Sequence, residues 1–197
     1  MRNYTTKMRS LPLFAIIQKS QRFLVNNPQD IAHDVGHHYR VWEGCMTIVQ
    51  EEQLSVDSDA LQIAAWIHYI DHDKKGQPFL LHLQTAFGLT NELTHRIQQI
   101  VREQAYGQTT TMIESAIVSD ADRIELLSIP RWQFVFAACQ EGIVSKEARD
   151  EYIQRVKVRI PNLSHKLHFE STNKLFLEKI APFELWAERQ GVAANQR

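Results

Sequence analysis

The spacing of apolar residues along the chain predicts helices almost throughout. Apolar positions recur every three or four residues in most segments, which is the spacing of one face of an α-helix. No segment shows the sustained alternation of apolar and polar residues that is typical of a strand, and no pattern repeats with a period of about 20 to 50 residues. The expected helices lie near 14–24, 33–49, 61–67, 80–87, 92–104, 113–127, 130–141 and 171–190, with one more after Ser145. The sequence therefore predicts an all-α fold.

One of these helices differs from the others because it is apolar on nearly every side. The segment 61–67 is almost continuously apolar, and such a helix is expected to be buried rather than amphipathic. It leads directly into His68, Asp71, His72 and Asp73. A buried helix that ends in this way delivers polar side chains into the interior, where they must be paired, hydrogen-bonded or bound to a metal. A second polar cluster from elsewhere in the chain is therefore expected.

The length and composition of the chain predict one globular unit with a substantial core. With 197 residues, 44% of them hydrophobic, the chain is long enough for a single domain over residues 1–197. We expect the core of this domain at about 15–140, with the helices of 145–190 packed on it. The sequence carries no indication of the oligomeric state.

The charge, the cysteines and the hydropathy narrow the class of partner. Lysine and arginine number 22 against 23 acidic residues, so the net charge of −1 gives no basic footprint for nucleic acid, although a local pocket can still bind a small anion. The two cysteines, Cys45 and Cys139, lie in apolar helical contexts and are expected to be reduced thiols, which favours the cytoplasm. The only apolar N-terminal segment, 11–17, contains Pro12 and is too short for a signal or a membrane span, so no membrane association is expected.

Histidine and aspartate occur in three clusters, each at the start or the end of an apolar helix. These clusters are 33–38, 68–73 and 120–122, and together they can line one pocket. Imidazole and carboxylate groups suit divalent ions such as manganese, iron, cobalt, nickel or zinc, and magnesium less well where histidines dominate. The sequence thus predicts a site for a divalent metal ion of unknown identity. For each histidine the alternative is a core residue hydrogen-bonded to a helix carbonyl.

Two of these clusters resemble motifs of a known family. The segment Ala32 to Trp42 resembles the His-Asp-x-x-His-x-x-Arg-Val opening of the HD-domain metal-dependent phosphohydrolases, especially their small stand-alone bacterial members. The segment Ile117 to Ile124 resembles their closing Asp-Ala-Asp-Arg-Leu motif. By order and spacing the resemblance covers about 15–127. It implies a helical bundle of the HD-domain type in which His37, His68 and Asp122 are metal ligands.

The sequence departs from the family pattern at two positions. The aspartate of the His-Asp pair is replaced by Tyr69, whose neutral phenol, with a pKa of about 10, is a poorer ligand for a divalent ion than a carboxylate. Asp71 or His72 could replace the missing ligand if the helix ends there. Relatives often carry a further histidine at the end of a later helix, but the corresponding segment, 102–107, has none.

The resemblance also suggests roles for charged residues around the three ligands. Asp120 or Asp71 would orient a water molecule or a ligand, and Arg40, Arg123 and Lys74 would neutralise phosphate charge. Each arginine follows an acidic motif, so pairing with a nearby carboxylate is the alternative. His33 and Asp34 are expected to cap the helix or to orient a metal ligand.

These observations lead to one main functional hypothesis and two alternatives. The main hypothesis is a cytoplasmic phosphohydrolase of the HD type, with an atypical site for a divalent metal ion, that acts on a small phosphorylated compound such as a nucleotide. The first alternative is an inactive HD-fold protein that binds a nucleotide or a protein partner without metal, and Tyr69 leaves the question of enzymatic activity open. The second is that tyrosine replaces aspartate in this chain only, in what is naturally an enzyme.

Overall fold

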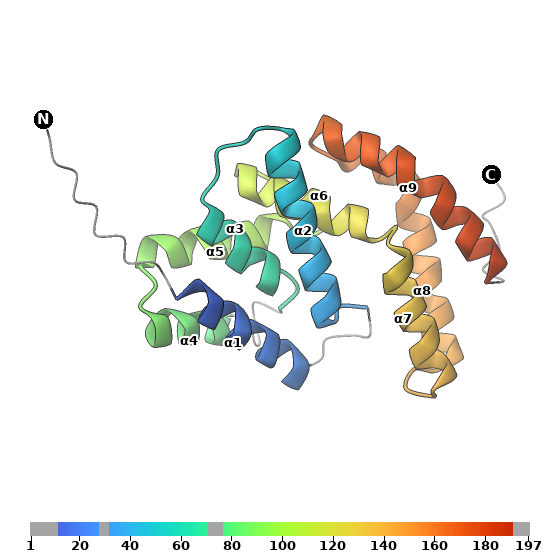
Figure 1. The fold of residues 1–197 in the computed structure, drawn as a ribbon, viewed down its shortest axis with the longest axis horizontal. Coiled ribbons are helices and arrows are strands. Elements are labelled where there is room, and N and C mark those ends of the chain that lie inside the picture. Colours follow the sequence, from blue (N-terminus) through green and yellow to red (C-terminus); the bar gives the residue numbers. More distant parts are fainter. Residues whose placement is uncertain (1–11, 28–31, 71–76, 191–197) are drawn as a thin grey trace, which may run out of the picture.

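The computed structural model describes residues 12–27, 32–70 and 77–190, and these residues form helices and connecting loops without any strand (Figure 1). This confirms the predicted all-α class. The α-helices are α1 (Leu13–Asn26), α2 (Val35–Glu51), α3 (Ser58–Ile67), α4 (Gln77–Phe87), α5 (Asn91–Glu103), α6 (Ile113–Glu125), α7 (Ile129–Gln140), α8 (Lys146–Arg159) and α9 (Glu170–Arg189). Two short 3₁₀ helices, η2 (Ile160–Asn162) and η3 (Ser164–Lys166), connect α8 to α9.

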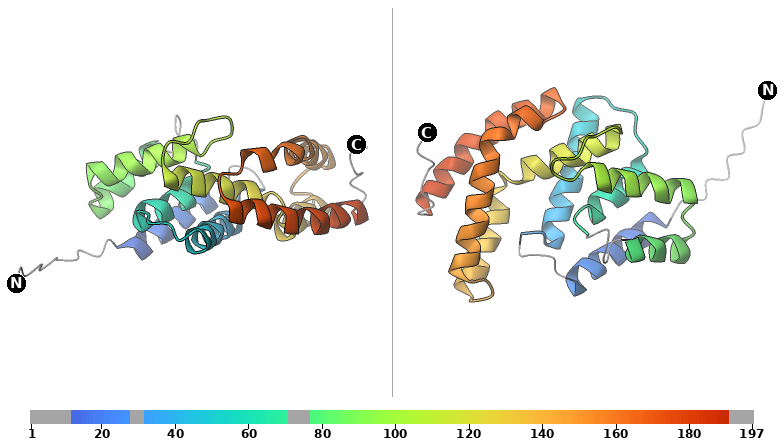
Figure 2. Two further views of the ribbon diagram at one scale, coloured as in Figure 1. Left: turned by 90° about the horizontal axis from the view of Figure 1, so that it is seen from above. Right: turned by 180° about the vertical axis from the view of Figure 1, so that it is seen from behind.

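The helices bury two adjoining apolar clusters that meet at α6. Helices α1 to α6 enclose the larger cluster, and the end of α6 together with α7, α8 and α9 encloses the smaller one. Figures 1 and 2 show α7, α8 and α9 grouped at one end of the molecule, with α4 and α5 at the other. The division of the chain into domains stays a prediction. Among the helices of the described residues, none combines the length and apolar character needed to cross a membrane.

Helix α3 is buried on nearly every side, as its apolar sequence predicts. Every residue from Ala60 to Ile67 except Gln62 is buried, and most are completely inaccessible. The helix begins at an N-cap provided by Asp57, whose side chain accepts a hydrogen bond of 3.0 Å from the backbone N–H of Ala60. Because α3 packs against α1, α2, α5 and α6, its C-cap residue His68 is held inside the bundle.

The start of α6 is held by α5, and not by a capping box within its own sequence. The spacing of Thr111 and Glu114 suggests such a box, but this expectation is wrong. Glu103, at the end of α5, accepts hydrogen bonds from the backbone N–H groups of Thr111 and Met112 at 2.8 and 3.1 Å. The Glu114 carboxylate is instead buried, where it accepts a hydrogen bond of 2.6 Å from Arg96. The ion pair outcompetes the local cap because a buried carboxylate needs a charged partner.

The role of Glu103 predicts a loss of stability in acid. Partial burial alone would raise the pKa of Glu103, but hydrogen bonds from Thr111, Gln99 and Met112 outweigh this effect and lower the pKa to about 2. The folded state therefore has a lower pKa than the unfolded chain, so the contribution of Glu103 is complete above about pH 4.5 and disappears as the pH falls towards 2. We expect Glu103→Gln to lower the free energy of unfolding at pH 7 by about 0.5 to 1 kcal/mol, the value of a partly exposed helix cap.

Urea unfolding followed by circular dichroism at pH 7, 4.5 and 3 measures this difference. The gap between the wild type and Glu103→Gln should narrow as the pH falls. Glu184→Gln is the control, because this exposed residue of α9 makes no such contact. A gap that is constant over the three pH values would contradict the assignment.

Candidate metal centre

Three helices bring the predicted ligands together at one point. His37 lies in the first turn of α2, His68 follows the last residue of α3, and Asp122 lies in α6. The Nε2 atoms of the two histidines are 3.2 Å apart, and Oδ1 of Asp122 lies 3.4 Å from His37 Nε2 and 3.6 Å from His68 Nε2. Three potential ligand atoms, contributed by three different helical segments, thus form a nearly equilateral triangle.

The hydrogen bonds of the two imidazoles fix which ring nitrogen faces the triangle. Nδ1 of His37 lies 2.8 Å from Oε2 of Glu125, and Nδ1 of His68 lies 2.8 Å from the carbonyl oxygen of Ala65. Both partners accept hydrogen bonds, so each Nδ1 carries a proton and donates it. In the neutral rings both Nε2 lone pairs then point at each other and at Asp122. A cation relieves the repulsion between three such acceptors.

The charges around the triangle favour this state of protonation. Burial lowers the pKa of His37 well below its ordinary value, and the positive charge of Arg131 lowers it further, so the ring is neutral at pH 7. Burial would raise the pKa of Asp122, but nearby positive charge, including that of Arg131, outweighs this effect and lowers the pKa below its ordinary range. The centre therefore presents one carboxylate and a neutral imidazole of His37.

The triangle has the size that a first-row divalent ion requires. An ion with ligands at about 2.1 Å places neighbouring ligand atoms roughly 3.0 to 3.4 Å apart in octahedral or tetrahedral coordination. The distances of 3.2, 3.4 and 3.6 Å lie at or slightly above that range. The donor set, two imidazoles and one carboxylate, is that of many sites for such ions. The residues present therefore fit a divalent metal ion.

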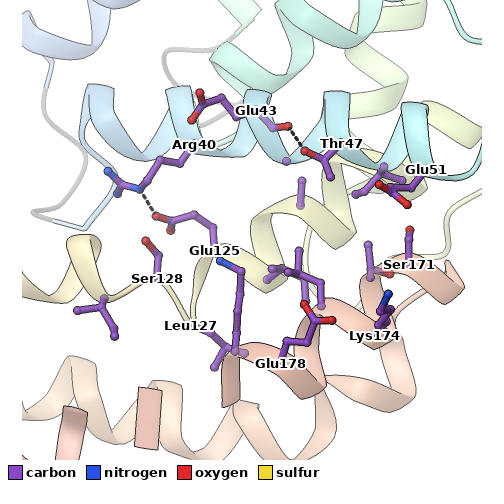
Figure 3. A pocket seen from close by; sticks show the side chains of 18 of the residues that line it. Arg40, Glu43, Thr47, Glu51, Glu125, Leu127, Ser128, Ser171, Lys174 and Glu178 are labelled. Atoms are coloured by element: carbon purple, nitrogen blue, oxygen red, sulfur yellow. Dashed lines mark hydrogen bonds and ion pairs between the residues drawn. The ribbon is translucent and has the colours of Figure 1, made fainter. Parts of the chain in front are cut away.

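Behind His37, the carboxylate of Glu125 joins three helices. It lies at the end of α6 and accepts hydrogen bonds of 2.6 Å from Nε of Arg40 and 2.6 Å from Nη1 of Arg131, in addition to the contact with His37. Figure 3 shows the contact between Arg40 and Glu125. Arg40 thus pairs with a carboxylate, which is the alternative that the sequence left open, and it acts on the metal centre through Glu125.

Arg131 is a component of the site that the sequence motifs do not reveal. Its guanidinium group is 2% exposed. Besides Glu125, it donates a hydrogen bond of 2.6 Å to the hydroxyl of Tyr152 on α8, and its Nη2 lies 3.2 Å from Nε2 of His33. One feature of the sequence could have indicated this role, because Arg131 is the only charged residue within α7. A single charge in an apolar helix usually has a buried partner.

The side chain of Asp120 connects α6 to the segment at the start of α9. Its carboxylate is completely buried and accepts hydrogen bonds of 2.7 Å from the backbone N–H of His168, 2.7 Å from the His168 ring and 2.7 Å from the hydroxyl of Thr172. These contacts hold the start of α9 against α6. They occupy both oxygens, so the geometry does not favour the expected role of Asp120 in orienting water. Asp71 and Lys74, which were also expected to act at the site, lie outside the described residues.

Tyr69, at the position of the missing aspartate, lies beside the metal triangle and is 39% exposed. Its ring stacks on the His33 ring with a centroid distance of 3.3 Å and an angle of 6°. The segment 102–107, which lacks the later histidine, contains Gln104, whose side-chain amide donates a hydrogen bond of 2.9 Å to the carbonyl oxygen of His68. Gln104 therefore positions the backbone of a proposed ligand.

A cavity of about 350 Å³ opens beside His68 and Asp122. Arg123, which was expected to neutralise phosphate, lies on its wall, and its Nη1 donates a hydrogen bond of 2.5 Å to the carbonyl oxygen of Lys166. The wall is unusually rich in cationic and aromatic side chains. These are Arg123, Arg131, Arg155, Arg159, Tyr69, Tyr106 and Tyr152.

A second and larger cavity, of about 730 Å³, lies on the other side of Glu125. Figure 3 shows that α2 and α9 form two of its walls, with Arg40, Glu43 and Lys174 among the side chains that line it. Its lining mixes acidic and basic groups over an apolar floor, and none of the three metal-ligand candidates lies on it.

Known proteins resemble this chain in their solved structures, whereas comparisons of sequence found no match. No protein-family model and no curated protein matches the sequence. Among solved structures, a Lactobacillus plantarum protein matches with a TM-score of 0.68 and 16% identity, over 91% of this chain and 94% of its own. A protein described as a predicted HD superfamily hydrolase, from an uncultured Thermotogales bacterium, matches with a TM-score of 0.62 and 20% identity, over 96% of this chain and 97% of its own.

The chain has the HD-domain fold. Bacillus subtilis YpgQ, solved in complex with ADP, matches it with a TM-score of 0.61 and 19% identity, over 90% of this chain and 94% of its own. These matches extend the likeness well beyond the sequence motifs of 15–127, to nearly the whole chain. In the HD fold of this protein, His37, His68 and Asp122 come together as the resemblance implied. Their role as metal ligands remains a prediction.

The contact between Glu125 and His37 predicts that Glu125 controls metal affinity. A carboxylate that accepts the Nδ1 proton of a ligand histidine fixes its tautomer and raises its basicity, and removal of such a partner typically costs 10- to 100-fold in affinity. We expect Glu125→Gln to weaken the binding of Mn²⁺ or Zn²⁺ by about 10- to 100-fold.

Isothermal titration of the metal-stripped protein measures this affinity, with circular dichroism to establish that the variant is folded. Glu43→Gln is the matched control, since Glu43 lies on α2 near Arg40 but away from the triangle. Equal metal affinity of folded Glu125→Gln and the wild type would exclude a role for Glu125 in the centre.

Proposed function

We propose that this protein is a metal-dependent phosphohydrolase that acts on a small phosphorylated compound, with a nucleotide as the expected class. The observation that carries the proposal is the triangle of His37, His68 and Asp122, in which hydrogen bonds to both Nδ1 atoms leave the Nε2 lone pairs facing inward. The HD fold and the arginines beside the triangle support the same conclusion. The complex of YpgQ with ADP supports a nucleotide as ligand.

In this proposal the three ligand residues would hold the divalent ion, and the arginines would bind the phosphoryl group. The bound ion supplies polarisation of a phosphoryl oxygen and a lowered pKa for water. Arg123 lies on the cavity wall and would neutralise phosphate charge through charge-assisted hydrogen bonds, while the buried guanidinium of Arg131 would add positive potential without contacting the phosphate. Hydrolysis adds the oxygen of a water molecule to phosphorus and breaks the bond to the leaving oxygen, which takes up a proton.

The hydrogen bonds behind the ligands keep the site organised during this reaction. Glu125 holds the His37 ring, and the Ala65 carbonyl holds the His68 ring. Gln104 fixes the His68 backbone from α5. Since each ligand is held by a second residue, the donors keep their geometry without the substrate, and this preorganisation reduces the reorganisation needed in the transition state.

Measurement of metal content and phosphatase activity tests the proposal. We expect near-stoichiometric divalent metal, by elemental mass spectrometry, in protein purified without chelator, and hydrolysis of a generic aryl phosphate in the presence of Mn²⁺. His68→Ala should abolish both, because two remaining ligands hold an ion poorly. His95→Ala, at an exposed position of α5, should change neither. Traces of metal together with no rate above that of heat-treated protein would reject the proposal.

Tyr69 favours a second candidate function, that of a nucleotide- or partner-binding protein without metal. A stacked tyrosine occupies the position where the family motif has a metal-binding carboxylate. Under this candidate the metal content is negligible, and binding survives His68→Ala. The metal measurement therefore separates the two candidates.

Restoring the carboxylate provides a further prediction. If the centre holds a metal ion through three residues, Tyr69→Asp adds an anionic ligand, and metal affinity should rise on the order of tenfold, with a matching gain in turnover. Tyr69→Phe keeps the ring that stacks on His33 and should leave metal affinity unchanged. Metal titration and the aryl phosphate assay on both variants measure these effects. Absence of any gain with Tyr69→Asp would show that the site has diverged beyond this one residue.

A further inference from the structure

The cavity wall formed by α8 carries two exposed arginines that acidic side chains of the protein neutralise only weakly or not at all. Arg155 and Arg159 lie on this wall and are both exposed. Arg155 has one acidic neighbour, Glu151, at 3.7 Å, and the two side chains are 61% and 72% exposed. Within the described residues no acidic group pairs with Arg159, which instead lies over the ring of Tyr106 at 5.1 Å. An exposed ion pair is worth less than about 1 kcal/mol, so Arg155 remains available for another anion.

These cations continue a row that starts at the metal centre. Arg131 contacts His37 and donates a hydrogen bond to the hydroxyl of Tyr152, so it connects the triangle to α8. Arg155 and Arg159 follow Tyr152 by three and seven residues, so all three share one face of the helix. Seven residues span about 10 Å of an α-helix, so the row leads away from the triangle along the wall.

Lys166 adds a positive charge at the far end of this row. Its Nζ lies 2.8 Å from the hydroxyl of Tyr106, which also lines the cavity, and 3.9 Å from the centre of the ring. The hydrogen bond from Lys166 lowers the pKa of Tyr106, as do the charges of Lys166, Arg159 and Arg123, although slight burial acts in the opposite direction. Arg159 and Lys166 thus place two positive charges around Tyr106 at the far end of the cavity, and neither forms an ion pair with a carboxylate of the described residues.

We propose that Arg155, Arg159 and Lys166 form an anion subsite that binds a second phosphoryl group, so that the preferred substrates carry at least two phosphoryl groups. Guanidinium groups bind phosphate through paired N–H donors, and two arginines on successive turns of one helix face present such donors side by side. The identification of the reacting phosphoryl group rests on the proposed function, but the subsite itself needs no metal. It is formed by the C-terminal helices, whereas the metal triangle is formed by α2, α3 and α6.

Binding of inorganic pyrophosphate and orthophosphate to the metal-free protein tests this subsite. The full chain, freed of metal on a chelating resin, is titrated with each anion at one fixed ionic strength. We expect pyrophosphate to bind at least tenfold more tightly than orthophosphate, since it reaches two groups of cations. In the double variant Arg155→Gln/Arg159→Gln the two affinities should lie within about twofold of each other.

Two controls separate a specific subsite from general attraction. Lys146→Gln removes a positive charge from the exposed first turn of α8, away from the cavity, and should keep the tenfold preference. The double variant Arg155→Lys/Arg159→Lys keeps the positive charge and should retain part of the preference for pyrophosphate that the glutamine variant loses. Equal affinities for the two anions in the wild type would overturn the proposal. So would a preference for pyrophosphate that persists in Arg155→Gln/Arg159→Gln, or a loss of this preference in Lys146→Gln as large as in that double variant.

The result is independent of the test for hydrolysis. A protein that lacks metal and activity but shows the arginine-dependent preference for pyrophosphate retains the subsite without the proposed reaction. A protein that hydrolyses aryl phosphate but shows no such preference retains the reaction without the subsite.

Discussion

The structure of the candidate site depends on the buried carboxylate of Glu125. It receives hydrogen bonds from His37 and Arg40 on α2 and from Arg131 on α7, while its own backbone ends α6. A buried carboxylate and a buried guanidinium are each costly to desolvate, and removal of one partner leaves the other uncompensated at a cost of about 3 to 5 kcal/mol. This cost fixes the relative positions of the three helices. It also fixes the tautomer of His37, so the same interaction stabilises the fold and orients the proposed metal ligand.

The two departures from the HD motifs have different structural consequences. The segment 102–107 lacks the later histidine, but its residue Gln104 donates a hydrogen bond to the His68 carbonyl and so supports the backbone of the proposed ligand. Tyr69 removes an anionic ligand and places an aromatic ring against His33 instead. His33 in turn contacts Arg131, so the stacked pair packs on the same buried network that holds Glu125. The tyrosine is thus integrated in the structure of the site.

Sequence reasoning predicted the parts of the molecule that depend on local patterns. The burial of α3 followed from its continuous apolar run, and the N-cap of α2 followed from Asp34, which accepts a hydrogen bond of 2.7 Å from the His37 N–H. The convergence of the three proposed ligands followed from the family motifs. The family resemblance suggested that Asp120 orients a water molecule or a ligand, yet its carboxylate contacts His168 and Thr172, which are distant in sequence. Such partners depend on how α9 returns to α6, and no local pattern encodes that path.

The positions of the arginines in the cavity also could not be predicted from local sequence patterns. Arg131, Arg155 and Arg159 lie outside every motif, and α8 has the polar composition of an ordinary solvated helix. Only the packing of α7 and α8 beside α6 brings these residues onto the wall of the cavity that opens beside the triangle. The candidate metal centre is therefore built from α2, α3 and α6, and the opposite wall from helices that are held mainly by apolar packing. Because apolar packing tolerates exchange of exposed side chains, this wall can change its charge pattern without disturbing the ligands. Under the proposed function, substitutions on this wall can thus change substrate preference while the triangle of His37, His68 and Asp122 stays the same.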